Sequence, residues 1–299
     1  MKKFWYKAGF LLAVLVLFIA MDLGLRASGW VESSGLFPQN DFEITCRKHP
    51  EPVWEGVIYG SSELISSYRE DLSESGYVNL GMDYATMEDL YELLDGDYVT
   101  VGDELILALN WCLVCDELDT NPTYVWHKGA LEPWCYFQRD RIFGLIRDDA
   151  VALLNGKPLR QATHLADEKI FYHGRMTDEE HARRMERLNE LYFSKGMEGF
   201  DENLDYLGRV LDWCAGRGIR VRALWLPEDP ERDLGPVNDR VREECAGILE
   251  AHGIELYDMR GMFPSACFHD TGHFEYDAGA PLFTKELDKW ILSSKSGKP

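Results

Sequence analysis

Two short stretches near opposite ends of the chain carry residues that could together perform nucleophilic acyl chemistry. Ser62 follows Gly60 and Ser61 at the end of the apolar run VIYG. A serine held between a buried strand and a helix start is placed to attack a carbonyl carbon. Serine is also common in such turns as a helix cap alone. The stretch therefore indicates catalysis only if the chain supplies a base.

The second stretch, FHDTGHFEYDAGAPLF, supplies that base. Asp270 lies three residues before His273, so one turn of the chain brings the carboxylate to the imidazole. This is the arrangement of a histidine base with an orienting acid, and it predicts a catalytic set of Ser62, His273 and Asp270. His269 with His273 can also be interpreted as a weak metal pair. We expect that neither a metal nor a cofactor is needed.

Strands that alternate with helices must position these residues. Five short apolar runs are typical of strands, at 56–60, 77–81, 104–111, 219–227 and 254–259. Helical patterns separate most of them, and Thr86 with Asp89 and Thr177 with Glu180 have the spacing of capping boxes. Strands that are almost wholly apolar predict a parallel sheet with helices on both faces, which is a three-layer α/β/α fold. In such a fold the site lies at the carboxyl ends of the strands.

The N-terminus has the pattern of a membrane segment. Lys2, Lys3 and Lys7 precede AGFLLAVLVLFIAM, which has no charged residue. We predict that residues 1–28 form an uncleaved transmembrane anchor, although the h-region of a cleaved signal peptide is an alternative. The lysines favour a cytoplasmic N-terminus and an extracytoplasmic body in a single-pass protein of the cell membrane. Residues 29–52 are then a linker, and 53–295 the catalytic domain.

The interval 119–199 interrupts the alternation of strands and helices. It has no clear strand, is rich in aromatic residues and ends in a charged helical pattern. An interval of this length is too long for a plain connection. It predicts a helical insertion, which either packs over the sheet edge or forms a lid or docking surface over the active site.

Composition narrows the class of protein further. With 299 residues, 45% of them hydrophobic, the chain has enough apolar residues for one large core. The 31 basic and 52 acidic residues give a net charge of −21, and the body has no run of cations. Nucleic acid is therefore not an expected partner, because phosphate contacts need clustered cations.

The seven cysteines are an odd number, so at least one is unpaired within the chain. Cys112 and Cys115 form a C-x-x-C. We interpret them as two thiols at a strand end; a disulfide within the segment up to Cys135 and a metal site are the alternatives.

In the order of these motifs the chain resembles the SGNH, or GDSL-like, hydrolases and acyltransferases. The family's first block, Gly-x-Ser, is matched by residues 60–62, and its last, Asp-x-x-His, by residues 270–273. Gly81 matches the glycine after the second strand, and Asn110 the asparagine after the third. The resemblance implies a flavodoxin-like fold. We also expect an oxyanion hole built from the backbone N–H groups of Ser62 and Gly81 and the side-chain amide of Asn110.

A narrower resemblance is to the membrane-anchored DltD group, which acts in D-alanyl-lipoteichoic acid biosynthesis. The anchor, GSSEL, ALNW and CFHDTGHFEYDAGAPLF together carry it. It implies O-acylation, by D-alanylation or acetylation, of an extracytoplasmic glycopolymer such as teichoic acid. The implied partners are a membrane-bound O-acyltransferase, a donor linked to an acyl carrier, and a polyol or glycopolymer acceptor.

Two other hypotheses stay open at this point. The same residues would serve an esterase or deacetylase that hydrolyses acyl esters, and the chain could instead be a non-enzymatic scaffold for a membrane acyltransferase. An anionic polymer should be repelled by the acidic body. We therefore expect binding to use cations of the insertion, such as Arg139, Arg141 and Arg147.

Overall fold

The structure is a computed structural model, and it describes residues 2–28, 40–118, 120–121, 124–127, 139–157 and 168–295. The chain divides into two units. One contains residues 1–40 with 121–167. The other contains residues 41–120 with 168–299 and is called the body below. Cys135, a possible disulfide partner, and the side chain of Arg141 lie outside the part of the chain that is described.

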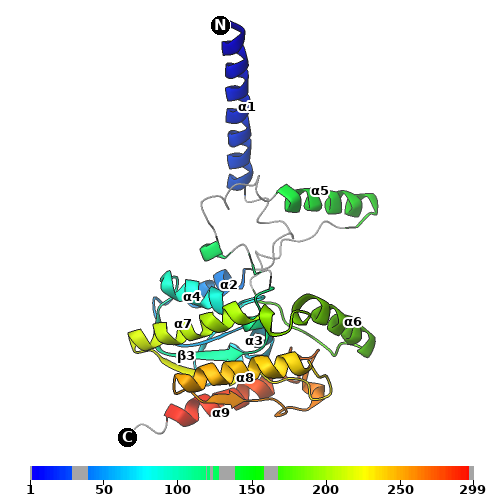
Figure 1. Cartoon of the computed structure of the whole chain (residues 1–299). Coiled ribbons are helices and arrows are strands. Elements are labelled where there is room, and N and C mark those ends of the chain that lie inside the picture. Colours follow the sequence, from blue (N-terminus) through cyan, green and yellow to red (C-terminus); the bar gives the residue numbers. More distant parts are fainter. Residues whose placement is uncertain are drawn as a thin grey trace. The chain divides into compact units, whose positions relative to one another are not determined.

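The body is built on a five-stranded sheet in which every pairing is parallel (Figure 1). The strand order is β2-β1-β3-β4-β5. The strands are β1 (Trp54–Gly60), β2 (Val78–Gly81), β3 (Val101–Leu109), β4 (Arg220–Trp225) and β5 (Leu256–Asp258). All five expected strands are confirmed, and with them the predicted α/β class. Parallel strands share one carboxyl edge, so the residues that follow β1 and β5 emerge on the same side of the sheet.

Helices cover the two faces of this sheet. On one face α4 (Met87–Asp95), α7 (Asp201–Arg217) and α8 (Pro236–Ala251) form a row in which α7 contacts both neighbours. On the other face α3 (Ser62–Ser67) contacts α9 (Ala280–Lys295). Right-handed crossovers between parallel strands require this division for the observed strand order. The three-layer architecture is therefore as predicted.

Apolar side chains of alternating strand positions fill the space between the sheet and α9. Ile58, Ile106 and Leu224 are fully buried in one cluster with Phe283 and Leu287 of α9. Burial of each such side chain stabilises the fold by roughly 1.5–3 kcal/mol. This packing fixes the last helix, and with it the segment that precedes α9, against the sheet.

Helix ends follow the sequence signals. Thr86 and Asp89 form a reciprocal capping box at α4, and Thr177 and Glu180 form another at α6 (Asp178–Leu188). Beyond α6 the helix continues as a π turn over Asn189–Phe193. Gly218, with a φ of 72°, ends α7 in the left-handed conformation that glycine adopts without strain. Short 3-10 turns lie at Glu70–Leu72, Cys112–Val114, Val125–His127, Gly196–Gly199 and Ser265–Cys267.

The boundaries of the body differ from those expected. The range 29–52, expected to be a linker, contains α2 (Asp41–Lys48), whose Phe42 and Ile44 are buried. The body therefore begins near Asp41, because two apolar side chains are enough to dock a short helix. The expected insertion is also divided, since residues 168–199 with α6 belong to the body.

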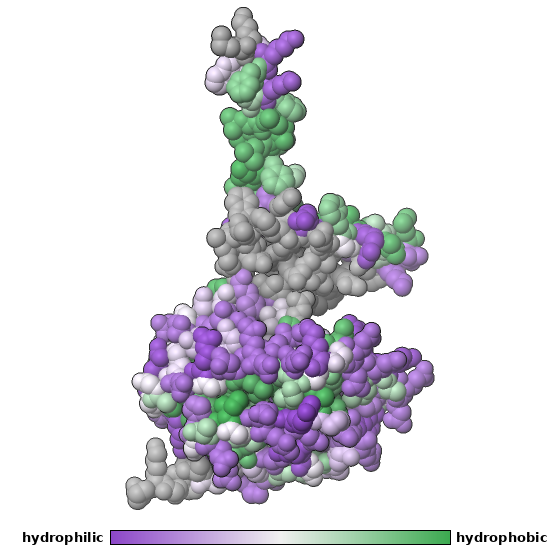
Figure 2. All heavy atoms as spheres, in the orientation of Figure 1, coloured by the Kyte–Doolittle hydropathy of each residue, from purple (hydrophilic) through white to green (hydrophobic). Residues whose placement is uncertain are grey.

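The other unit contains α1 (Lys2–Ala27) and α5 (Arg139–Leu154). By length and composition α1 can cross a membrane, and a signal sequence has the same character. Its apolar side chains, among them Leu11, Leu12 and Leu15, are exposed (Figure 2). The prediction of an N-terminal apolar helix is thus confirmed. Arg139 and Arg147, two of the cations expected to bind substrate, lie on α5.

A substitution at Gly279, just before α9, would test how tightly the segment that precedes this helix packs. A Cβ at this position would collide with the Cys267 carbonyl oxygen and the Phe274 ring. We expect Gly279→Ala to lower the free energy of unfolding by about 1–3 kcal/mol, the usual cost of overpacking. Gly247→Ala is the matched control, because this glycine lies within α8 and a Cβ there meets no atom within 4 Å. The control should be neutral or stabilising by up to about 1 kcal/mol in denaturant unfolding. Equal unfolding midpoints for the two variants would contradict this prediction.

Candidate active site

The structure brings the three predicted catalytic residues into one hydrogen-bonded chain. Ser62 is the first residue of α3, directly after β1, and its Oγ lies 2.9 Å from Nε2 of His273. Nδ1 of His273 lies 2.9 Å from Oδ2 of Asp270. Both Asp270 and His273 are buried, whereas Ser62 is half-buried. A base in contact with a hydroxyl and held by a carboxylate is the geometry required to activate a serine nucleophile.

Ser61, the other serine of the turn, has a different environment. Its backbone is the N-cap of α3, and its buried Oγ accepts hydrogen bonds from the backbone N–H of Glu63 and from Nδ2 of Asn110. The Ser61 hydroxyl therefore stabilises the turn through these two hydrogen bonds. This leaves Ser62 as the serine that faces the histidine.

The segment that carries Asp270 and His273 holds its own carboxylate in place. Oδ1 of Asp270 accepts hydrogen bonds from the backbone N–H groups of Gly272 and His273. Arg184, on α6, adds an ion pair of 3.1 Å to Oδ2 of Asp270. Burial opposes ionisation of Asp270, but His273 and Arg184 outweigh it and lower the pKa of the carboxyl below its usual value. Asp270 therefore stays charged beside the imidazole.

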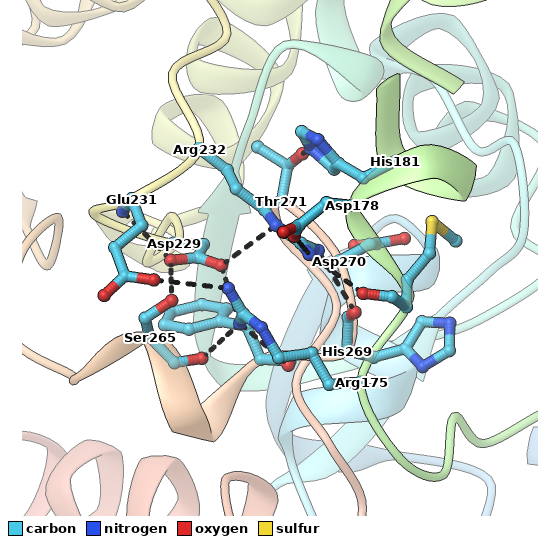
Figure 3. A network of polar contacts seen from close by, with 12 residues as sticks. Arg175, Asp178, His181, Asp229, Glu231, Arg232, Ser265, His269, Asp270 and Thr271 are labelled. Carbon is cyan, nitrogen blue, oxygen red and sulfur yellow. Dashed lines mark hydrogen bonds and ion pairs between the residues drawn. The ribbon is translucent and has the colours of Figure 1, made fainter. Parts of the chain in front are cut away.

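A second polar network fixes this segment to the rest of the body (Figure 3). At its centre, the buried carboxylate of Asp229 lies 2.9 Å from Arg175 and 3.7 Å from Arg232. Arg175 donates to the carbonyl of Ser265, and Ser265 Oγ donates to Asp229. Arg232 also donates to the carbonyl of His269. The residues before the catalytic turn are thus tied to the loop after β4 by buried charge, which is costly to break.

The triad opens into a pocket of about 260 Å³. One side of the pocket is aromatic and apolar, with Trp111 and Leu118 after β3 and Tyr192 beyond α6. Helix α6 contributes Arg184 and Arg187. The part of the insertion that belongs to the body therefore lines the site.

Two of the three expected oxyanion-hole groups have other partners in the structure. The N–H of Gly81 donates to Oδ1 of Asn79 at 2.9 Å, and Gly81 does not line the pocket. Asn110 donates to Ser61, as described above. Gly81 lies away from the pocket because β2 stays paired with β1 beyond this residue. The N–H of Met82 still donates to the Gly60 carbonyl. The chain turns only after that, so Asp83 and Tyr84 reach the pocket instead.

Tyr84 is in a strained backbone conformation. Its φ is 54°, in the left-handed region that non-glycine residues rarely adopt. Upstream, the N–H of Asp83 donates to Oδ2 of Asp41, at the start of α2. Burial and Asp41 together raise the pKa of Asp83 to about 6. Strain of this kind gathers at functional sites, where the surrounding contacts enforce it.

Glu63 is a pocket residue that sequence reasoning missed. It is 6% exposed and directly follows Ser62. Its carboxylate lies so close to Gly272 that a Cβ at that glycine would collide with it. Burial raises the pKa of Glu63 to about 7, although His273 and Asn110 oppose the shift. For His273, burial has the opposite effect and lowers the pKa. The negative charges of Asp270 and, to a smaller extent, Glu63 outweigh burial, so the pKa of the imidazole is raised overall.

The histidines of the alternative metal pair contact protein groups in the structure. Nδ1 of His269 contacts the Gly174 carbonyl, while both ring nitrogens of His273 are used within the triad. Cys112 and Cys115 are free thiols, as are the other cysteines in the described ranges.

Within those ranges, one cluster of surface side chains has ligand atoms close enough together to bind a metal ion. It contains His173, Glu275 and Asp277. The carboxylate of Glu275 already accepts hydrogen bonds from backbone N–H groups, among them those of Gly174 and Asp277.

Comparisons with known proteins give no family. No family model matches the chain, and no curated protein matches it. A solved structure that is similar is that of LAE5, an alpha/beta hydrolase enzyme from the metagenome of Lake Arreo, Spain. The two chains are 11% identical over 80% of this chain and 96% of the other, with a TM-score of 0.37. A likeness this distant assigns no function, so the argument for function depends on the site itself.

Glu63 should govern the pH dependence of the site. Its negative charge favours the imidazolium, so replacing it by glutamine should lower the pKa of His273. A base must be neutral to accept a proton, and the acidic limb of the rate profile should therefore move to lower pH in Glu63→Gln. The measurement is the rate of labelling by a fluorophosphonate between pH 5 and 9. Glu179→Gln, an exposed position on α6, is the control, and an unshifted limb in Glu63→Gln would refute the assignment.

The same carboxyl should make stability depend on pH. Because the pKa of Glu63 is raised, the folded state holds the proton more tightly than the unfolded state does. Its contribution is fully present below the ordinary value of 4.5 and is lost as the pH rises through about 7. At pH 8 the loss should be at most about 3 kcal/mol. Denaturant unfolding at pH 5 and pH 8 should show this loss in the native chain, and a smaller loss in Glu63→Gln.

Proposed function

We propose that this protein is a membrane-anchored serine acyltransferase of the SGNH type that O-acylates an extracytoplasmic glycopolymer. The observation that carries the proposal is the contact chain from Ser62 through His273 to Asp270 at the carboxyl edge of a parallel sheet. The order of the sequence motifs and the apolar helix α1 support it. The hydrogen bonds among the three residues, with Asp270 and His273 buried, also favour an enzyme over a scaffold with vestigial residues.

The reaction would begin when Ser62 Oγ attacks the carbonyl carbon of an ester or thioester. The serine proton passes to Nε2 of His273, and Asp270 stabilises the imidazolium that forms. The imidazolium then protonates the leaving alkoxide or thiolate, which leaves an acyl group on Ser62. A hydroxyl of the acceptor attacks this ester, loses its proton to His273 and carries the acyl group away. The imidazolium returns this proton to Ser62 Oγ as the bond between Oγ and the acyl carbon breaks, so serine and neutral histidine are regenerated and the cycle consumes no other group.

The acceptor and partner in this proposal follow from the resemblance to the DltD group. A polyol unit of a cell-wall polymer, such as teichoic acid, would receive a D-alanyl or acetyl group. The donor would come from a membrane-bound O-acyltransferase served by an acyl carrier. Anchoring suits such a relay, because tethering raises the local concentration of enzyme beside its donor.

Hydrolysis is the second candidate function, and one observation favours it. Ser62 is half-buried in a pocket that solvent can enter, so water could replace the acceptor hydroxyl. The protein would then be an esterase or deacetylase. Assay of one acyl ester with and without a polyol acceptor distinguishes the two, because a transferase forms the new ester and an esterase only the free acid.

The first test assigns the nucleophile. Ser62→Ala should abolish fluorophosphonate labelling, because the probe needs the oxygen in contact with His273. Ser61→Ala is the matched control from the same turn. It should keep most of the labelling and lose about 1 kcal/mol of stability, since Ser61 caps α3. Labelling that is lost in Ser61→Ala and kept in Ser62→Ala would overturn the assignment.

The second test concerns the anchor. The chain without residues 1–28 should fold and react with the probe, since the triad and its supporting networks lie in the body. It should nevertheless fail to acylate the polymer in cells, and an unrelated transmembrane helix at its N-terminus should restore part of the activity. The readout is the acyl ester content of isolated cell walls. Full acylation by a secreted, unanchored body would exclude the membrane relay.

A further inference from the structure

Arg187 is a cation of the pocket that forms no ion pair and no side-chain hydrogen bond with the described part of the chain. It lies on α6, lines the pocket and is exposed. Its neighbours on α6 are different, because Arg184 pairs with Asp270 and Arg183 with Glu179. The absence of an ion pair at Arg187 does not come from a shortage of acidic residues, because the protein has 52 acidic and 31 basic residues. Glu190, three residues further along the helical segment, is also not paired with it.

Two tyrosines of the pocket lie within the electrostatic reach of this guanidinium. The charge of Arg187 acts on the hydroxyls of both Tyr84 and Tyr192. Neither hydroxyl has a hydrogen-bond partner among the described residues, and both side chains line the pocket. Burial raises the pKa of each, so both remain neutral donors at pH 7. Tyr84 is also the pocket residue with the left-handed backbone conformation.

Three residues whose side-chain donor groups have no hydrogen-bond partner among the described residues thus line the pocket that also contains Ser62. A guanidinium with two hydroxyls matches an oxyanion, because charged hydrogen bonds are stronger than neutral ones. We propose that Arg187, Tyr84 and Tyr192 bind an anionic substituent, a phosphate or a carboxylate, of the molecule that is acylated or deacylated at Ser62. This inference rests on the proposed function for its reaction, but the binding can be measured without it.

The site would also resolve a conflict of charge. A body of net charge −21 repels an anionic polymer at long range. Arg187 supplies attraction at the one place where a reacting group must dock. The role expected of the α5 cations stays a prediction, whereas Arg187 of α6 lines the pocket itself.

The experiment is calorimetric titration of the full chain in detergent micelles with three small probes of similar shape. These are glycerol, glycerate and glycerol 1-phosphate. We expect at least one of the anions to bind about ten- to a hundredfold more tightly than glycerol, the range for a charged hydrogen bond. The better anion identifies the source as phosphate or carboxylate. Equal affinity for charged and uncharged probes would overturn the proposal.

Variants then locate the binding. Arg187→Gln should remove most of the preference for the anion, and Arg187→Lys should keep part of it. Arg183→Gln is the control on the same helix, because Arg183 does not line the pocket. An anion preference that survives in Arg187→Gln would refute the role of this residue.

Protection of Ser62 completes the test. The anion that binds should slow fluorophosphonate labelling in the native chain, and anion binding without protection would place the site elsewhere and overturn the proposal. Failure of the proposed function looks different. In that case Ser62 is not labelled at all, while the titration still reports whether Arg187 selects the anion.

Discussion

The hydrogen bond between Ser62 and His273 joins residues that are 211 positions apart, and much of the body is arranged around it. β1 is flanked by β2 and β3, whereas β5 lies at the sheet edge. The segment after β5 must therefore run back over the carboxyl ends of the strands to reach Ser62. Phe268 and Phe274 flank the catalytic turn, pair across it and are fully buried in the core. The Asp229 network holds the same segment from the other side.

The three carboxyl groups of the site differ in how far nearby positive charge compensates for their burial. Asp270 has the imidazole and Arg184 beside it, so it stays ionised despite burial. Glu63 and Asp83 are also withdrawn from water but lack an equal compensation, and their pKa values rise to about 7 and about 6. The cations near the triad come from α6, which the chain inserts between β3 and β4. The insertion thus provides the positive charge that the alternating core of the fold does not.

The sequence was sufficient to predict the elements, and it singled out the serine and the Asp-x-x-His motif that the structure brings into contact, because each of these is a local pattern. Apolar runs marked the strands, and Thr86 and Thr177 marked helix starts. Contacts between distant segments could not be read in this way. Glu63 resembled an ordinary helix residue, and Arg187 a solvated one, until the fold placed α6 over the pocket. The N–H of Gly81 has Asn79 as its partner, and pairing with β1 continues through the Met82 N–H before the chain turns.

The distance in sequence between Ser62 and His273 also orders events during biosynthesis. Synthesis from the N-terminus produces Ser62 early and His273 only near the end of the chain. Until the final helix has docked, Ser62 has no partner to take its proton. A chain that ends before His273 therefore lacks this contact, which forms only when the segment between β5 and α9 has joined the body.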